Sequence, residues 1–158
     1  MATLFAAQCQ NCNFSQRIVG KSDYAYRLSS PPDVFMWVQL AWCSACQEVV
    51  QAEKLLSDAE IEERIDGSQN RRIRQDAERY RQMMQDRQSP ARCLSCGSDS
   101  IIAASSDWQE RFLPHPACGG IISLTQSGFV RSGQTEIYSP EGEHLAAIDG
   151  ILIPGRGY

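Results

Sequence analysis

Residues 93–97 read CLSCG and residues 115–120 read HPACGG. Each stretch places two metal-binding side chains three positions apart and follows the second with glycine. Two such turns can direct four side chains at one ion, and the spacer 97–114 falls within the window of roughly 15–20 residues typical of paired zinc knuckles. The glycines suit a closing turn that needs positive φ. We therefore predict a structural zinc site formed by Cys93, Cys96, His115 and Cys118.

Two further CxxC pairs occur earlier in the chain, at Cys9/Cys12 and Cys43/Cys46. All seven cysteines thus fall into half-sites, and disulfides are disfavoured in a reducing cytosol. We predict a second zinc site from these four cysteines, which makes two Zn²⁺ per chain. Neither pair is followed by glycine, and Asn13 is expected to adopt positive φ more readily than Gln47.

The half-sites can also be paired in a crossed way, with Cys43/Cys46 joining Cys93/Cys96. Sequential pairing closes shorter loops and therefore costs less chain entropy. On that ground we favour the sequential pairing, and the crossed pairing is the alternative.

The two knuckles at 93–97 and 115–120 resemble a zinc ribbon of the rubredoxin-like knuckle type. The phrase RFLPHPACGG at residues 111–120 is similar to one in uncharacterised bacterial proteins with paired CxxC ribbons. The resemblance implies metal binding and carries no established activity, because zinc ribbons serve many unrelated functions.

Other chemistries of paired cysteines are less favoured. A rubredoxin-like electron carrier would hold iron between Cys9/Cys12 and Cys43/Cys46, but rubredoxin knuckles characteristically have glycine after the second cysteine. The histidine in the other site favours zinc over an iron tetrathiolate centre. A redox-active dithiol needs a single CxxC, whereas this chain has four matched half-sites.

Composition indicates a protein without a membrane segment. The most apolar stretch, residues 34–43, is far shorter than the roughly 20 residues of a spanning helix. The N-terminus lacks the basic region of a secretory signal, so we expect a cytoplasmic location. The formal net charge is −4. Seven thiolates and two Zn²⁺ bring the loaded protein to about −7, which disfavours nonspecific nucleic-acid binding.

The pattern along the chain predicts an α+β fold in which two small β-rich zinc ribbons are joined by a helical hairpin or bent helix. The expected sections are an N-terminal ribbon at 1–50, a helical connector at 51–90, and a C-terminal ribbon with a β-hairpin at 91–158. Tyr24, Tyr26 and Leu28 alternate as in a strand, and residues 34–42 read as one central strand. The type I turn sequence at 139–142 predicts a hairpin between 135–138 and 143–148.

Two helices are expected in the connector. Ser57 and Glu60 form a capping box, and Gly67-Ser68 should separate the first helix from a second at about 70–87. The second helix carries a predicted apolar stripe, which comprises Ile73, Ala77, Tyr80 and Met84.

The arginine-rich segment is the strongest functional signal outside the knuckles. Its cations are Arg71, Arg72, Arg74, Arg79, Arg81, Arg87 and Arg92. They either balance the acidic residues of 53–66 or contact phosphate. The chain shows no catalytic motif, so we expect a noncatalytic zinc-binding module with a protein partner. The alternatives are nucleic-acid binding through the Arg71–Arg92 helix and pairing of the apolar stripe in a homodimer.

Overall fold

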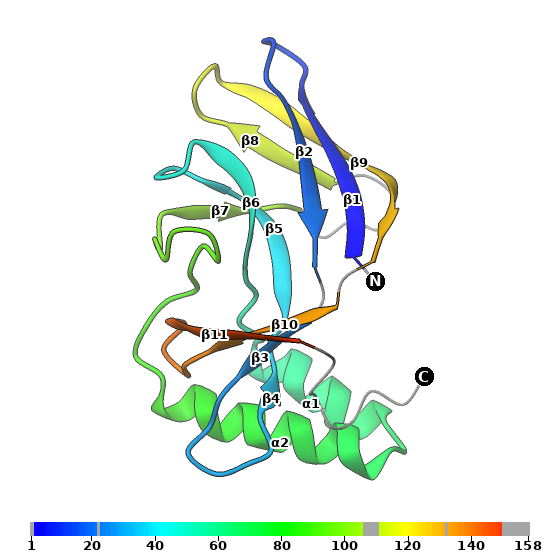
Figure 1. Ribbon diagram of the computed structural model, residues 1–158, viewed down its shortest axis with the longest axis vertical. Coiled ribbons are helices and arrows are strands. Elements are labelled where there is room, and N and C mark those ends of the chain that lie inside the picture. The colour runs from blue at the N-terminus through cyan, green and yellow to red at the C-terminus, as the bar shows by residue number, and fades with distance from the viewer. Residues whose placement is uncertain (1, 22, 106–110, 132, 150–158) are drawn as a thin grey trace. The chain divides into compact units, whose positions relative to one another are not determined.

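Figure 1 shows the computed structural model, which describes residues 2–21, 23–105, 111–131 and 133–149. The chain forms two compact units that interleave along the sequence. Unit 1 consists of residues 1–22, 38–53 and 91–132, and unit 2 of residues 23–37, 54–90 and 133–158. The units therefore do not follow the expected order of ribbon, connector and ribbon, because segments of one unit are inserted between segments of the other.

Unit 1 contains a four-stranded antiparallel sheet in the order β2-β1-β9-β8. Its strands are β1 (Ala2–Cys9), β2 (Ser15–Gly20), β8 (Arg111–His115) and β9 (Gly120–Val130). Alternate residues of β1 face inward, so Ala7 is buried beside its partner Leu124. The pairing of β1 with β9 joins a hairpin near the start of the chain to one more than a hundred positions later.

The second sheet of unit 1 has the order β6-β5-β7. It comprises β5 (Val38–Cys43), β6 (Glu48–Glu53) and β7 (Ile101–Ala103). The inward side chains of both sheets form one apolar cluster, which contains Ala7, Ile18, Leu40, Trp42, Val49, Leu113, Ile122 and Leu124. This packing of sheet on sheet supplies the core that holds the cysteine-bearing turns.

Glutamine side chains join the two sheets along β2 and β6. The Gln16 amide donates to the Val49 carbonyl and accepts from the Val49 N–H, both at 2.9 Å. The Gln51 amide makes the same pair of bonds with the backbone of Lys21, at 2.7 and 2.9 Å. Each amide therefore imitates a strand partner for a peptide group at a sheet edge.

Replacing Gln16 with alanine is expected to lower the free energy of unfolding by about 2 kcal/mol, because the N–H and C=O of buried Val49 both lose a partner. The matched control is Gln8→Ala, at an exposed position of β1, which should change the free energy of unfolding by less than about 0.5 kcal/mol. Chemical denaturation of both variants measures the difference. Equal effects of the two substitutions would contradict the bridging role of Gln16.

Unit 2 contains a mixed sheet and both helices. Its sheet has the order β11-β10-β3-β4, with β3 parallel to β10. The strands are β3 (Tyr24–Tyr26), β4 (Val34–Phe35), β10 (Gln134–Tyr138) and β11 (His144–Asp149), and the helices are α1 (Asp58–Gly67) and α2 (Arg71–Asp86). The expected hairpin at 135–148 is confirmed by the pairing of β10 with β11.

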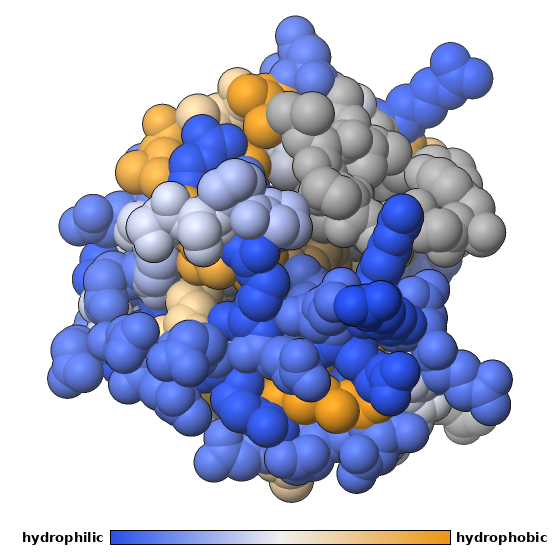
Figure 2. All heavy atoms as spheres, turned by 90° about the horizontal axis from the view of Figure 1, so that it is seen from below, coloured by the Kyte–Doolittle hydropathy of each residue, from blue (hydrophilic) through white to orange (hydrophobic). Residues whose placement is uncertain are grey.

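The helix boundaries follow the local signals. Ser57 and Glu60 make the predicted capping box, and Asn70 caps α2 through its side chain. The apolar stripe differs from the prediction, since Met83 is buried with Ala77 and Tyr80 while Ile73 is 45% exposed. The first turn of α2 thus extends past the packed part of the helix. In the view of Figure 2, most of the visible described residues are hydrophilic.

The predicted single strand over 34–42 is divided in two. Val34–Phe35 forms β4 in unit 2, whereas Val38–Cys43 forms β5 in unit 1 and runs into the cysteine turn as expected. An unbroken apolar run cannot reveal this division, because both pieces are buried. Trp108 and the tail beyond residue 149 lie outside the described residues. No helix in the described part of the chain is both long and apolar enough to span a membrane.

Asp76 in α2 has an unfavourable environment for its charge. Burial raises the pKa of its carboxyl to about 6, against the opposing effects of the Phe35 N–H and Arg79. A raised folded-state pKa means that the folded protein binds this proton more tightly than the unfolded chain. The free energy of unfolding therefore increases as pH falls from about 6 toward 4. At neutral pH the ionised carboxylate lowers it.

Asp76→Asn is expected to stabilise the protein at pH 8 by about 1–2 kcal/mol and to have little effect at pH 4. The amide oxygen can still accept the Phe35 N–H. The effect is measured as the difference in melting temperature between the variant and the wild type at each pH. This difference removes any pH effect that is common to both proteins. Asp86→Asn, on an exposed position of the same helix, is the control. A benefit that is the same at pH 4 and pH 8 would rule out the proton linkage.

Candidate metal centres

Eight cysteine and histidine side chains form two groups, and the ligand atoms of each group lie within 4.8 Å of one another. The inner group is Cys43, Cys46, Cys93 and Cys96, and the outer group is Cys9, Cys12, His115 and Cys118. The names refer to the sequence, because every member of the inner group lies between Cys12 and His115. Both groups belong to unit 1.

The sequential pairing predicted from the sequence is wrong, and the crossed pairing is observed. The pairing of β1 with β9 brings the β1–β2 turn and the β8–β9 turn to the same end of one sheet. The loop that the outer group closes then contains roughly a hundred residues, and the loop that the inner group closes contains roughly 45. Each doubling of a loop costs only about 0.6 kcal/mol, so crossing adds about 2 kcal/mol in all. Burying a single core side chain contributes a comparable free energy.

The inner group is built on two turns of the same shape. The Gln47 N–H donates to the Cys43 carbonyl and the Gly97 N–H to the Cys93 carbonyl, both at 2.9 Å. Gln47 has φ of 57° and Gly97 has φ of 75°. Gln47, not Asn13, therefore takes the left-handed conformation, contrary to expectation. A side chain at that φ is unusual and indicates that the surrounding turn holds it there.

Glu53 holds the second turn of the inner group. This carboxylate is fully buried and accepts the Arg92 N–H at 2.9 Å, while its own N–H donates to the Arg92 carbonyl. Ala52 forms a β-bridge with Cys93, and the Leu94 N–H donates to the Gln51 carbonyl. Residues 92–94 thus follow the edge of β6 and bring Cys93 over the β5–β6 turn.

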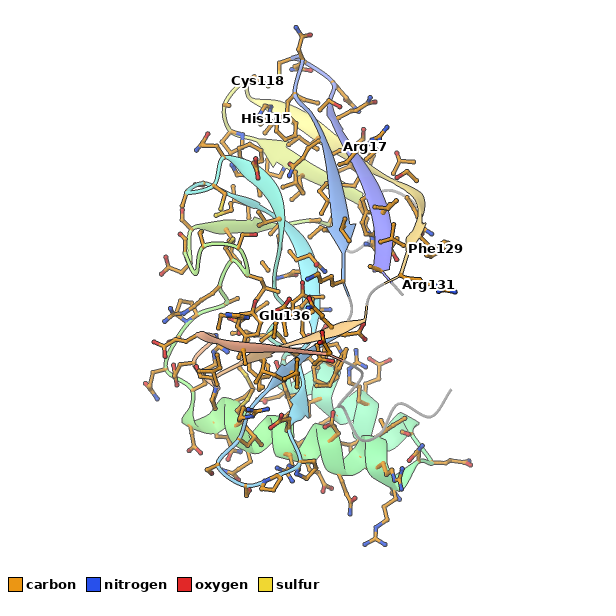
Figure 3. The ribbon with its side chains drawn as sticks, viewed as in Figure 1. Arg17, His115, Cys118, Phe129, Arg131 and Glu136 are labelled. Carbon is orange, nitrogen blue, oxygen red and sulfur yellow. The ribbon has the colours of Figure 1, made fainter. Side chains whose placement is uncertain are left out.

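The outer group is formed by the turns that end two hairpins. The Cys9 and Cys118 sulfurs are 3.5 Å apart, and His115 Nδ1 lies 3.4 Å from the Cys12 sulfur and 3.2 Å from that of Cys118. His115 and Cys118 are labelled at the β8–β9 turn in Figure 3. A side chain at Gly120 would place its Cβ 3.0 Å from the Cys9 sulfur, so glycine permits the two turns to approach this closely.

The His115 ring is enclosed by aromatic side chains. Its centroid lies 4.9 Å from Phe14 and 4.9 Å from Trp42, and the residue is only 4% exposed. Pro114 precedes it on β8, an edge strand where proline costs no ladder bond. Packing therefore fixes the orientation in which Nδ1 faces the sulfurs.

The donor atoms fit a tetrahedral ion. Zn–S bonds of about 2.3 Å place two sulfurs about 3.8 Å apart, and a nitrogen at about 2.0 Å lies about 3.5 Å from a sulfur. The inner sulfurs of Cys43 and Cys96 are 3.7 Å apart, and those of Cys46 and Cys93 are 3.9 Å apart. The outer distances are slightly shorter. All seven cysteines are free thiols, so the spacing is not that of disulfides, which is about 2.05 Å.

Backbone N–H groups favour the thiolate form at some ligands. Partial desolvation opposes the effect at Cys9, but the Asn11 N–H and the His115 ring lower its pKa to about 6. The Ser98 N–H lowers the pKa of Cys96, whereas burial raises the pKa of Cys93. Thiolates bind metal and thiols do not, so ion binding at these groups should release protons.

Comparison with protein-family models, with curated proteins and with solved structures found no match for the chain. The support for a metal centre therefore comes from the donor set and its geometry. Sequence reasoning named all eight side chains of the two groups but missed the supporting roles of Glu53, Phe14 and Trp42. An acid at the end of the mainly apolar segment 49–53 was the signal for Glu53. The contacts of Phe14 and Trp42 with His115 depend on the fold and leave no local signal.

Proposed function

We propose that the protein is a noncatalytic zinc-binding protein with two structural Zn²⁺ ions and that it acts by binding another protein. The observation that carries the proposal is the convergence of four donors at each of two points with tetrahedral spacing. Four protein ligands close the coordination shell and leave no position for a substrate. Sulfur and imidazole donors favour zinc among the common divalent ions.

Each ion would stabilise a different sheet. The outer ion ties the β1–β2 turn to the β8–β9 turn, and the inner ion ties the β5–β6 turn to the segment that leads into β7. In this respect each ion serves as the cross-link of a zinc ribbon, with donors taken from distant parts of the chain. We accordingly expect chelation to unfold unit 1.

Metal analysis tests the zinc assignment. Protein purified without chelator should contain two zinc ions per chain and be colourless. The inner group is a tetrathiolate and is the place where iron would bind in a rubredoxin-like electron carrier, so red protein containing iron would support that alternative. One metal ion per chain, or none, would overturn the two-site proposal.

The first turn of α2 is the surface that we assign to the partner. Ile73 is 45% exposed there and is surrounded in sequence by the exposed Arg71, Arg72 and Arg74. An apolar side chain among cations suits an acidic protein segment with an apolar anchor. The same arginines suit phosphate, which makes nucleic acid the second candidate. A homodimer through the whole apolar stripe is not supported, because Ala77 and Tyr80 are buried within the chain.

The exposed arginines of the run are Arg71, Arg72 and Arg74. Arg79 donates to backbone carbonyls of residues 30–32, Arg81 pairs with Glu62, and Arg87 is buried. Charge reversal of Arg71, Arg72 and Arg74 together should therefore abolish partner binding, whereas Arg17→Glu on exposed β2 should not.

Affinity purification from the native host, with and without nuclease, distinguishes the two partners. A protein that is retained after nuclease treatment and lost from the triple variant supports the proposal. Loss of all partners on nuclease treatment, together with binding of oligonucleotides that weakens with added salt, would replace it with the nucleic-acid function. The proposal places the protein in the cytoplasm, where the thiols stay reduced.

A further inference from the structure

The two ligand groups are nested in the sequence. The path from Cys12 to His115 runs through roughly a hundred residues when the inner group is open. An ion that joins Cys43 to Cys96 shortens this path to roughly 50 residues, namely 13–43 and 96–114. Halving a loop favours its closure by about threefold. Filling the inner group should therefore strengthen the outer group through chain connectivity alone.

A packing contact connects the same two groups. Trp42 directly precedes the inner ligand Cys43 on β5, and its ring centroid lies 4.9 Å from that of the outer ligand His115. Trp42 is 2% exposed and also packs on Phe14, at 5.6 Å. An ion at Cys43 fixes the end of β5, and Trp42 then provides a formed wall for the His115 ring.

The groups differ in their access to solvent. In the inner group Cys43 is fully buried and Cys93 is 2% exposed, whereas Cys46 is half-buried and Cys96 is exposed. In the outer group Cys12 and Cys118 are exposed and Cys9 is half-buried. Two of the four outer donors, against one of the four inner donors, are therefore open to a chelator or a competing thiolate.

We propose that the two ions bind in a fixed order, the inner group first and the outer group second, and that the outer ion is the one that exchanges. The inference rests on the proposed function, since it requires that both groups bind metal. The order follows from a coupling free energy between the inner and the outer group. This coupling comes from the shortened loop and from the packing of Trp42 on His115. Such coupling is reciprocal, so a filled outer group also strengthens the inner one.

Titration of the reduced metal-free protein with Co²⁺ tests the order. Cobalt held by four thiolates and cobalt held by three thiolates and an imidazole have different visible spectra. The Cys12→Ser/Cys118→Ser variant gives the spectrum of the inner group alone. In the wild type the first equivalent should reproduce that spectrum, and the second should add the outer one. The outer spectrum appearing first, or both growing together from the first addition, would overturn the order.

The outcome also distinguishes this inference from the proposed function. Two bound ions that fill in parallel overturn only the order, whereas a chain that binds no cobalt overturns both. In the zinc-loaded wild type, a chromogenic chelator should remove one ion quickly and the second slowly, and the rapidly lost ion should be absent from the Cys12→Ser/Cys118→Ser variant.

The contribution of Trp42 is measured with three variants. Trp42→Leu should weaken cobalt binding at the outer group by roughly tenfold when the inner group is filled, and Trp42→Phe should weaken it less. Trp37→Leu is the matched control, because Trp37 packs on Phe35 and Tyr80 in unit 2. It should change outer-group affinity by less than twofold. The same small change for Trp42→Leu would overturn the role of Trp42, and the wild-type titration decides the order even if that variant does not fold.

Discussion

Replacing Cys93 with serine is expected to remove one of the two proposed zinc ions and the stability that this ion gives to the β5–β6 turn and the segment after α2. Cys93 is 2% exposed and contributes to both the inner group and the β-bridge to Ala52. Structural zinc binding contributes about 10–16 kcal/mol in small zinc domains, which is comparable to the whole stability of a domain. Zinc analysis and thermal melting measure the loss, and Ser95→Ala in the same turn should change neither.

Double variants make this experiment a test of the crossed pairing. Cys46→Ser combined with Cys93→Ser removes two ligands of the inner group, so one zinc should stay bound in the outer group. Cys93→Ser combined with Cys118→Ser removes one ligand from each group and should leave no tightly bound zinc. The reverse result, with zinc lost from the first pair and retained by the second, would restore the sequential pairing.

Replacing Arg87 with methionine is expected to destabilise unit 2 by about 3 kcal/mol, because three partly buried carbonyl groups lose a charged donor. Arg87 is 8% exposed, and its guanidinium donates to the carbonyls of Ser89, Pro90 and Pro140 at 2.8–2.9 Å. The guanidinium also lies over the Tyr26 ring, at 5.8 Å. It thereby joins the end of α2 to the β10–β11 turn.

Denaturant unfolding, monitored by a spectroscopic signal from unit 2, measures the change in the free energy of unfolding that each Arg87 substitution causes. Arg87→Lys keeps the charge but loses the planar fork, so its loss of stability should be intermediate. Arg74→Met, at an exposed position of the same helix, should change the free energy of unfolding by less than about 0.5 kcal/mol. A melting curve of Arg87→Met that matches the wild type would show that the donor is dispensable.

Features set by neighbouring residues were predictable from the sequence. The capping box at Ser57 and Glu60, the break at Gly67 and the turn at 139–142 depend on contacts within four positions, and the structure has all three. The ligand spacing within each half-site is equally local. For this reason the eight donors could be chosen before the fold was known.

The pairing of half-sites depends on the fold as a whole. The entropy of loop closure favours sequential pairing by only about 2 kcal/mol, and the β1–β9 ladder with its buried core outweighs that preference. The positive φ of Gln47 has a similar origin, because the turn geometry prevails over the residue's own preference. The division of residues 34–42 between two units was likewise hidden, since apolarity does not record which core a strand enters.

The nested order of the ligands also matters while the chain is being made. Cys9 and Cys12 leave the ribosome long before His115 and Cys118, and so does β1 before its partner β9. At translation rates of about 5–20 residues per second, the roughly hundred intervening residues take about 5–20 seconds to synthesise. During that interval the first two thiols are open to oxidants and to unintended metal ions. A nascent chain of this protein would therefore benefit from reducing conditions or a chaperone at the ribosome exit.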